Sequence, residues 1–467
     1  MRRVKTGARW GIVALVLVVS TSVATLAQVV SAGATPAVTP RASGNATAAY
    51  QQSITDAVTA IQAYWRREYP DLYGGRYIPV PPARVIAATP GAKLPACQGH
   101  KLTYQDAAQN AFYCFDDNFV VYDNAKLFPQ LYKDYGGFAL ALVLAHEWGH
   151  AIQDRAGNGN QPTIDQELQA DCFAGAWTDQ QSNSSSRPVL KPGDLEASLA
   201  AMLSFRDQPG TSPDDPSAHG SAFDRISAFQ DGFESGPQQC AGYFAKPPLV
   251  VELPFSSASE QASGGQVAAK DVIPLSVELL NDFYSKVEPG WVKLDTSSVE
   301  AFDSSKPATI PKCGGSKLTV KQVQNRVFYC IDDEYVAFDQ PYLQHVFDDI
   351  GDFGVTSLIA SPFATRAQTI QGEPGVAGND LADVFQADCY TGGFMAALYN
   401  GALDVEASLS PGDLDELIQA FLEYSRARGV SAKVPITFLR MGYIRRGFFS
   451  GYQSCDLSTI QDEVKNL

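Results

Sequence analysis

The spacing of hydrophobic and polar residues predicts that this chain is mainly helical. Between residues 57 and 69, apolar side chains recur at the spacing of an amphipathic helix. Apolar or periodic stretches predict further helices at 137–153, 164–177, 195–205 and 221–233. Two strand-like runs, FYCF at 112–115 and FVVYD at 119–123, flank an Asp-Asp-Asn turn and predict a hairpin. Helices combined with one small antiparallel sheet indicate an α+β fold.

The spacing of the cysteines occurs twice along the chain. Cys97 and Cys114 are separated by 17 positions, as are Cys313 and Cys330. Cys172 and Cys240 are separated by 68 positions, and Cys389 and Cys455 by 66. The surrounding residues agree, since LQADCFAG at 168–175 parallels FQADCYTG at 385–392 and PGDLEA at 192–197 parallels PGDLDE at 411–416. We therefore expect one α+β domain to be present twice in tandem, with the two copies packed against each other.

The expected boundaries follow from this repeat. The first copy covers residues 49–245 and the second covers 271–457. A linker at 246–270 joins them, and its segment EQASGGQVAAK at 260–270 has the composition of one. A C-terminal tail occupies 458–467.

The cysteines predict disulfides rather than a metal site. Their number is even, and no two form a CxxC pair. Because each copy keeps its own four, we expect the pairs Cys97–Cys114, Cys172–Cys240, Cys313–Cys330 and Cys389–Cys455. Pairing between the copies is the alternative.

The N-terminus predicts export from the cytoplasm. Basic residues at positions 2, 3, 5 and 9 precede an apolar run at 10–19, and Ala-Gly-Ala follows at 32–34. This arrangement is typical of a secretory signal peptide at 1–34. The alternative is an uncleaved membrane anchor, because 10–30 is long enough to span a bilayer. In both cases the rest of the chain is extracytoplasmic, secreted or in the cell envelope, and 35–48 is expected to be a flexible linker.

The overall charge excludes one class of partner. The formal net charge is −16 and the pI is near 4.7. Nucleic acids require a basic surface, so we expect no nucleic-acid partner.

The stretch HEWGH at 146–150 carries the candidate chemistry. On a helix, His146 and His150 lie one turn apart on the same face, where both imidazoles can reach one metal ion. Glu147 between them is placed to act as a general base toward a water molecule. Glu167, on the next expected helix, is the candidate third ligand, and Asp171 one turn later is a candidate hydrogen-bond partner for a ligand histidine.

The alternative is an ordinary helix that contains two histidines, and the second copy provides a control. HEWGH corresponds there to SPFAT at 361–365, and Glu167 corresponds to Val384. The cysteines and the QADC helix remain while these residues are lost together, which indicates that they work as a group. Ser361 and Pro362 also predict that the second copy begins a shorter helix at this point.

Two further residues have open roles. His219 falls near Val434 of the second copy and is lost with the ligand group. We assign it the stabilisation of an oxyanion, with helix capping or packing as the alternative. Asp171 persists as Asp388 in the copy without ligands, so it either has an additional structural role or does not support the metal site.

The motifs together resemble a known family. HEWGHAIQ, QELQADCFAGAW at 166–177, AHGSAFDR at 218–225 and the terminal GFESGPQQC look like the bacterial predicted neutral zinc metallopeptidases. The resemblance implies a zincin-like fold with a zinc cofactor and a peptide or protein substrate. It implies that His146, His150 and Glu167 bind zinc, that Glu147 is the general base, and that the strand FVVYD is an edge strand that aligns the substrate.

These observations predict an extracytoplasmic zinc endopeptidase with one Zn²⁺ per chain, in the N-terminal copy. The second copy, catalytically inactive, would serve as a scaffold, a substrate exosite or a lid, or would regulate the peptidase by occluding its site. The alternative from another class is a non-enzymatic binding or scaffold protein of the cell envelope with a structural or vestigial zinc site. A structural zinc would need a fourth protein ligand, and the sequence offers no obvious one.

Overall fold

The computed structural model describes residues 43–465, apart from positions 160, 185, 186, 189, 192, 373–380 and 428–435. The chain divides near residue 250 into two compact units, and the short segments 208–211 and 221–223 belong to the second. The expected signal segment at 1–34 lies outside the described residues. Within the described part, no helix combines the length and the apolar character needed to cross a membrane.

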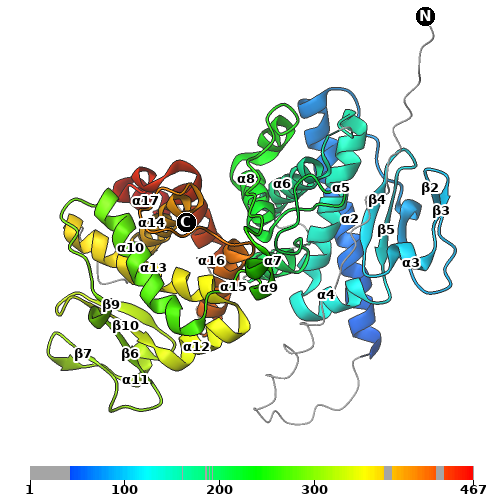
Figure 1. The fold of residues 1–467 in the computed structure, drawn as a ribbon. Coiled ribbons are helices and arrows are strands. Elements are labelled where there is room, and N and C mark those ends of the chain that lie inside the picture. The colour runs from blue at the N-terminus through cyan, green and yellow to red at the C-terminus, as the bar shows by residue number, and fades with distance from the viewer. Residues whose placement is uncertain are drawn as a thin grey trace, which may run out of the picture. The chain divides into compact units, whose positions relative to one another are not determined.

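The first unit is mainly helical, with a small sheet in the first half of its sequence (Figure 1). It begins with α2 (Ser43–Tyr73) and continues with the 3₁₀ turn η1 (Pro82–Arg84), β1 (Val85–Ala88), β2 (Ala96–Cys97), β3 (His100–Lys101), α3 (Tyr104–Ala107), β4 (Ala111–Cys114) and β5 (Phe119–Asp123). The helices α4 (Leu127–Tyr135), α5 (Gly137–Ala156), α6 (Thr163–Ser182), α7 (Asp194–Ser204) and α8 (Ala222–Gly242) follow. The α+β class is therefore confirmed, as are the five expected helices, while α2 shows that the expected linker at 35–48 is wrong from Ser43 onward.

The expected antiparallel hairpin is present as β4 and β5, and a third strand, β1, joins it. The strand order of the sheet is β1-β5-β4, with β4 antiparallel and β1 parallel to β5. The strand β1 was not predicted, because VIAA is too short to show a period along the sequence. The strand FVVYD consequently lies in the centre of the sheet, and β4 forms the edge, so the expectation that FVVYD is the edge strand is wrong.

The expected Asp-Asp-Asn turn connects β4 and β5. Asp116 and Asn118 adopt positive φ angles of 64° and 53°, which Asp and Asn tolerate better than most residues. The Asp117 carboxylate accepts a hydrogen bond from the backbone N–H of Gln98 at 2.6 Å. The turn therefore also holds the β2–β3 hairpin against the sheet.

Helix α5 is the centre of the first unit. All its residues from Phe138 to Gln153 are buried. It packs against α2, α4, α6 and α7 and against strand β4. A helix that is enclosed on all sides is normally apolar throughout, so the charged residues at 146–150 need partners within the protein.

The second unit has the same order of elements after its own long first helix. That helix is α10 (Ala269–Val287), followed by η2 (Thr296–Ser298), β6 (Val299–Phe302), β7 (Lys312–Cys313), β8 (Ser316–Lys317), α11 (Val320–Val323), β9 (Val327–Cys330) and β10 (Tyr335–Asp339). The helices α12 (Gln340–Asp349), α13 (Asp352–Gln371), α14 (Leu381–Tyr399), α15 (Asp413–Ala427) and α16 (Ile436–Ser450) come next. Its sheet has the order β6-β10-β9, again with one parallel and one antiparallel pair.

Two regions of the second unit contain more helix than expected. The segment 246–270, expected to be a linker, includes α9 (Ala258–Ser263) and the start of α10. The end of the chain, expected to be a tail, contains η3 (Tyr452–Ser454) and α17 (Leu457–Val464).

Pro362 does not begin a shorter helix, and this expectation is wrong. Helix α13 continues through Pro362 from Asp352 to Gln371. A proline within a helix costs about 3 kcal/mol, because it removes one backbone hydrogen bond and its ring clashes with the preceding turn. The neighbouring Ala360 and Phe363 are completely buried. Burial of this face stabilises the helix by enough to offset the proline.

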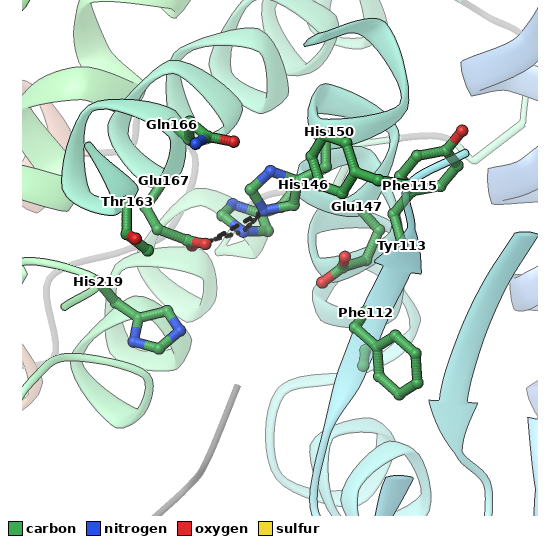
Figure 2. A pocket seen from close by; sticks show the side chains of 11 residues that line it. Phe112, Tyr113, Phe115, His146, Glu147, His150, Thr163, Gln166, Glu167 and His219 are labelled. Carbon is green, nitrogen blue, oxygen red and sulfur yellow. Dashed lines mark hydrogen bonds and ion pairs between the residues drawn. The ribbon is translucent and has the colours of Figure 1, made fainter. Parts of the chain in front are cut away.

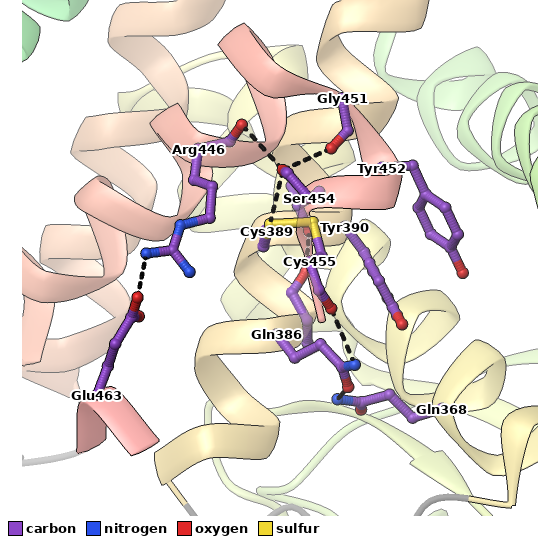
Figure 3. The surroundings of a disulfide bond; sticks show 12 residues. Gln368, Gln386, Cys389, Tyr390, Arg446, Gly451, Tyr452, Ser454, Cys455 and Glu463 are labelled. Atoms are coloured by element: carbon purple, nitrogen blue, oxygen red, sulfur yellow. Dashed lines mark hydrogen bonds and ion pairs between the residues drawn. A yellow bond between two sulfur atoms is a disulfide. The ribbon is translucent and has the colours of Figure 1, made fainter. Parts of the chain in front are cut away.

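The four disulfides pair as expected from the repeat. They join Cys97–Cys114, Cys172–Cys240, Cys313–Cys330 and Cys389–Cys455. Cys172 in α6 is bonded to Cys240 in α8, and Cys389 in α14 to Cys455 after η3 (Figure 3). In Figure 3 the Cys455 carbonyl also accepts a hydrogen bond from Gln386 at 3.1 Å, so the covalent link and the hydrogen bond hold the same two segments together.

Two glycines bring α6 and α8 unusually close together. A Cβ atom at Gly175 would lie 1.9 Å from the carbonyl oxygen of Phe229, and one at Gly232 would lie 1.8 Å from that of Cys172. The second unit repeats this arrangement between α14 and α16 at Gly392 and Gly447, with distances of 1.9 and 1.8 Å. Each crossing therefore depends on backbone-to-backbone packing that only glycine permits.

We expect Gly175→Ala to lower the free energy of unfolding by about 3 kcal/mol or more, because the added methyl group overlaps a backbone carbonyl and α8 must shift. Gly242→Ala is the matched control, since a Cβ there meets no atom within 4 Å, and its effect should stay within about 1 kcal/mol. Denaturant unfolding of the oxidised protein measures both. Equal stability of the two variants would contradict the close crossing.

Candidate metal centre and active site

Five of the residues singled out in the sequence line one cavity of the first unit. His146, Glu147 and His150 come from α5, Glu167 comes from α6, and His219 comes from the segment before α8. All five are buried. Figure 2 shows the Glu147 and Glu167 carboxylates and the His219 ring directed toward the same space from different elements.

The three candidate ligands converge on a single point. The Nε2 atoms of His146 and His150 lie 3.2 Å apart. The Glu167 carboxylate bridges them, with Oε2 3.1 Å from Nε2 of His146 and Oε1 3.3 Å from Nε2 of His150. One donor atom from each residue lies within 4.8 Å of the others. Two imidazole nitrogens and one carboxylate are a donor set that Zn²⁺ prefers, so these residues fit the metal.

Hydrogen bonds to the other ring nitrogens orient both imidazoles. Nδ1 of His146 donates to Oδ1 of Asp171 at 2.7 Å, and Nδ1 of His150 donates to Oε1 of Gln153 at 2.9 Å. The Gln153 amide is itself fixed, because its Nε2 donates to the backbone carbonyl of Gln166 at 2.6 Å. With the proton held on Nδ1, the Nε2 lone pair of each histidine is available to a metal.

The role of Asp171, which the sequence left open, is twofold. Arg225 donates to both of its carboxylate oxygens, from Nε at 2.7 Å and from Nη2 at 3.0 Å. The corresponding pair in the second unit, Asp388 and Arg440, makes the same two hydrogen bonds at 2.8 Å each. The paired carboxylate is therefore part of the fold in both units, and only in the first does it also bind a histidine.

The carboxylates of the site favour a positive charge at the position of the ligand histidines. Burial alone would lower the pKa of His146, but the Asp171 carboxylate, with a smaller contribution from Glu167, outweighs burial and raises the pKa to about 10. Burial alone would raise the pKa of Glu167, but the imidazoles of His150 and His219 and hydrogen bonds from the ligand histidines hold it well below its usual range. Since a cation in this position stabilises the anionic carboxylate, the same arrangement suits a bound metal ion.

Glu147 has the properties of a general base next to these ligands. Burial is the main cause that raises the pKa of its carboxyl group, which the neighbouring histidines only partly oppose. The backbone N–H of Tyr113 in strand β4 donates to the carboxylate, while its Oε2 has no hydrogen-bond partner. The free oxygen lines the cavity, where it can accept a proton from a water molecule or substrate.

His219 is held by a carboxylate that was not singled out in the sequence. Its Nδ1 lies 3.4 Å from Oδ1 of Asp207, and the backbone N–H groups of His219 and Gly220 donate to Oδ2 of Asp207 at 2.7 and 2.8 Å. The opposite ring nitrogen, Nε2, has no hydrogen-bond partner. The Asp207 carboxylate therefore fixes the ring while Nε2 remains able to donate a hydrogen bond within the cavity.

Strand β4 forms the opposite wall of the cavity. Ala111, Phe112 and Tyr113 line it together with Phe115 from the following turn. The centre of a water-sized sphere can occupy about 20 Å³ of this cavity, which is room for about one water molecule or an ion. Because β4 is the edge of the sheet, its outer backbone groups lie beside the candidate metal centre.

Several supporting residues could not be recognised from the sequence. They are Gln153, Asp207, Arg225 and Tyr113, which act on the site through hydrogen bonds. Two signals were available: Gln153 follows His150 by three residues and recurs as Gln368, and Arg225 recurs as Arg440. Asp207 could not be recognised, because it lies far along the chain from α5.

Comparisons with known proteins agree with this geometry. A family model described as "Putative neutral zinc metallopeptidase" matches residues 5–243. The chain is 36% identical over 156 residues to "Uncharacterized protein YpfJ" of Escherichia coli K12, covering 28% of this chain and 52% of that protein. It is 34% identical over 161 residues to "Uncharacterized protein Rv2575" of Mycobacterium tuberculosis H37Rv, covering 29% of this chain and 55% of that protein.

The chain thus spans about half the length of the curated relatives it matches. No solved structure matches it. The family match contains every residue of the candidate site and takes in just over half of the 467 residues. The chain therefore belongs to this family of neutral zinc metallopeptidases.

Proposed function

We propose that this protein is a zinc-dependent endopeptidase that acts outside the cytoplasm, with a single catalytic site in its first unit. The observation that supports it most directly is the convergence of His146, His150 and Glu167 within 4.8 Å beside the unpaired carboxylate oxygen of Glu147. The family match supports zinc as the metal. The location outside the cytoplasm is supported by the signal-like N-terminus and the four disulfides.

The proposed reaction is hydrolysis of a peptide bond. Bound zinc supplies a Lewis acid that polarises the scissile carbonyl and lowers the pKa of the attacking water. Glu147 accepts the proton from that water through its free Oε2 and then delivers the proton to the leaving amine. His219, oriented by Asp207, donates a hydrogen bond from Nε2 to the developing oxyanion.

The number of ligands favours a catalytic role over a structural one. A structural zinc is enclosed by four protein ligands, whereas a catalytic zinc keeps one position open. Among the described residues, the group around Glu167 provides three donors within 4.8 Å, and no fourth Cys, His or carboxylate joins them. The open position would face the cavity that Glu147 and His219 line.

Strand β4 is the proposed substrate-aligning element. An extended peptide can add to an exposed sheet edge through backbone hydrogen bonds. β4 is such an edge, and its residues Ala111 to Tyr113 lie along the cavity. A peptide paired there would pass its scissile bond across the metal centre.

The second unit is proposed to be an inactive copy that arose by tandem duplication. The recurring order of elements, the disulfides and the Asp388–Arg440 pair support the duplication. Ser361, Thr365 and Val384 occupy the positions of the three ligands and cannot bind zinc there. We propose that this copy acts as a scaffold or regulator for the first.

Purified protein should contain one zinc ion per chain. His146→Ala and Glu167→Ala should each lose it, because two remaining donors bind zinc weakly. His345→Ala is the matched control, since that histidine is exposed and far along the chain in the second unit. Metal analysis of the three variants measures this, and two zinc ions in the wild type would contradict the single site.

Glu147→Gln should keep its zinc and lose activity toward a protein substrate by a factor of about 10² to 10⁴, because the amide cannot accept the proton. Comparison of zinc content and cleavage rate separates a lost base from a lost metal. Full activity of the zinc-loaded variant would remove Glu147 from the mechanism.

His219→Ala should reduce kcat by about 10² to 10³ while KM changes little, because the hydrogen bond to the oxyanion forms only in the transition state. Zinc content should be unchanged. A variant that raises KM alone would instead indicate that His219 binds substrate.

A further inference from the structure

Three buried carboxylates meet in the second unit, which contains no residue of the proposed peptidase site. Asp352 is the first residue of α13, and Asp413 and Glu416 lie in the first turn of α15. Their side chains are buried, and one oxygen atom from each lies within 4.8 Å of the others. We call these residues the acidic trio.

Hydrogen bonds satisfy only part of this cluster. The Glu416 carboxylate accepts from Nε2 of Gln266 at 2.5 Å and from the backbone N–H of Phe353 at 3.0 Å. Asp352 accepts through Oδ2 from the backbone N–H of Val267 at 2.7 Å. Its Oδ1 has no hydrogen-bond partner, although Asp352 is only 7% exposed.

The charge of the trio is also uncompensated. Within the described residues, no Lys, Arg or His side chain forms an ion pair with Asp352, Asp413 or Glu416. Glu260 adds a fourth negative charge nearby, where its carboxylate accepts from the Ser410 hydroxyl. Burial is the largest cause, and repulsion from the neighbouring carboxylates the next, that raises the pKa of Glu416 to about 7. The same two causes raise the pKa of Asp413 well above its usual range. Buried like charges of this kind require either protons or a cation.

The first unit shows that the fold does not need these acids. Gly137 occupies the position of Asp352 and Ala197 that of Glu416, while Asp194 corresponds to Asp413. Helices α5 and α7 nevertheless begin at the matching positions, Gly137 and Asp194. Capping of the helix ends therefore does not explain the two additional carboxylates, which occur together in the unit that lacks the histidine ligands.

We propose that Asp352, Asp413 and Glu416 form an oxygen-donor site for a hard divalent cation, Ca²⁺ in particular. A Ca²⁺ ion binds oxygen atoms at about 2.4 Å, so it can bridge two oxygens up to about 4.8 Å apart. One oxygen from each member of the trio lies within 4.8 Å of the others. A cation there would bind the Asp352 carboxylate, whose Oδ1 has no hydrogen-bond partner. The trio contains no nitrogen or sulfur donor, so it selects against Zn²⁺ relative to the first unit.

The test uses the full-length protein with its zinc retained, at pH 8. The Tm is measured first in a Ca²⁺-selective chelator and then after Ca²⁺ or Mg²⁺ is added to about 1 mM. Added Ca²⁺ should raise the Tm of the wild type and bind directly in a calorimetric titration. Asp352→Gly, which installs the first unit's residue, should abolish the Tm shift. Glu416→Gln, which preserves the size of the side chain, should weaken Ca²⁺ binding by about tenfold or more.

Glu278→Gln is the matched control, because it removes an exposed carboxylate of α10 in the same unit and should leave the Ca²⁺ response unchanged. No Ca²⁺ binding by the wild type would overturn the proposal and leave protons as the neutralising groups. A Ca²⁺ response that persists in both trio variants would also overturn it, because the ion would then bind elsewhere. Zinc content and peptide cleavage provide separate readouts, so neither result depends on the peptidase function.

Discussion

The contact between α5 and α6 is the interaction on which the candidate site of the first unit depends. Helix α5 is enclosed by other elements, yet it contains two histidines and a glutamate in one turn. Their burial is tolerated because α6 presents Glu167 and Asp171 to the same face, and Arg225 neutralises Asp171 in turn. Both histidines, Glu167 and Asp171 have partners at hydrogen-bond distance, whereas Glu147 keeps one carboxylate oxygen unpaired. The candidate metal ligands are therefore positioned by the core of the unit and not by loops.

Comparison of the two units separates the charged residues that both contain from those found only in the first. The Asp–Arg pair and the glycine crossings of the last helices are present in both. A third shared feature is a hydrogen bond between two consecutive helices. Gln153 of α5 donates to the backbone carbonyl of Gln166 in α6, and Gln368 of α13 donates to that of Asp383 in α14. Without a histidine beside it, burial raises the pKa of Asp388, whereas the pKa of Asp171 is lowered by Arg225 and His146. The retained pair thus stabilises the fold, and its second use as a histidine partner occurs only in the first unit.

The sequence predicted the parts of the site that are close together along the chain. His146, Glu147 and His150 lie within five consecutive residues, so the helical period alone places the two histidines on one face with Glu147 beside them. The α+β fold class and the long helices followed from the periodicity of apolar residues, and the disulfide pairing followed from the repeated cysteine spacing. The mixed sheet was not predicted, because its third strand has four residues and pairs with a strand 35 positions later, from Val85 to Val120. The uninterrupted α13 was also missed, because local proline chemistry was outweighed by burial of the surrounding face.

The sequence by itself therefore determined the donor chemistry: which residues could bind a metal, and which half of the chain contains them. These are properties of residue type and short-range spacing. Only the tertiary structure decided which strand forms the edge beside the site, which carboxylate holds His219, and that Asp352 approaches Asp413 and Glu416. Those pairings join residues far apart in the chain, and they depend on how the helices pack to bury apolar surface, which no local pattern specifies.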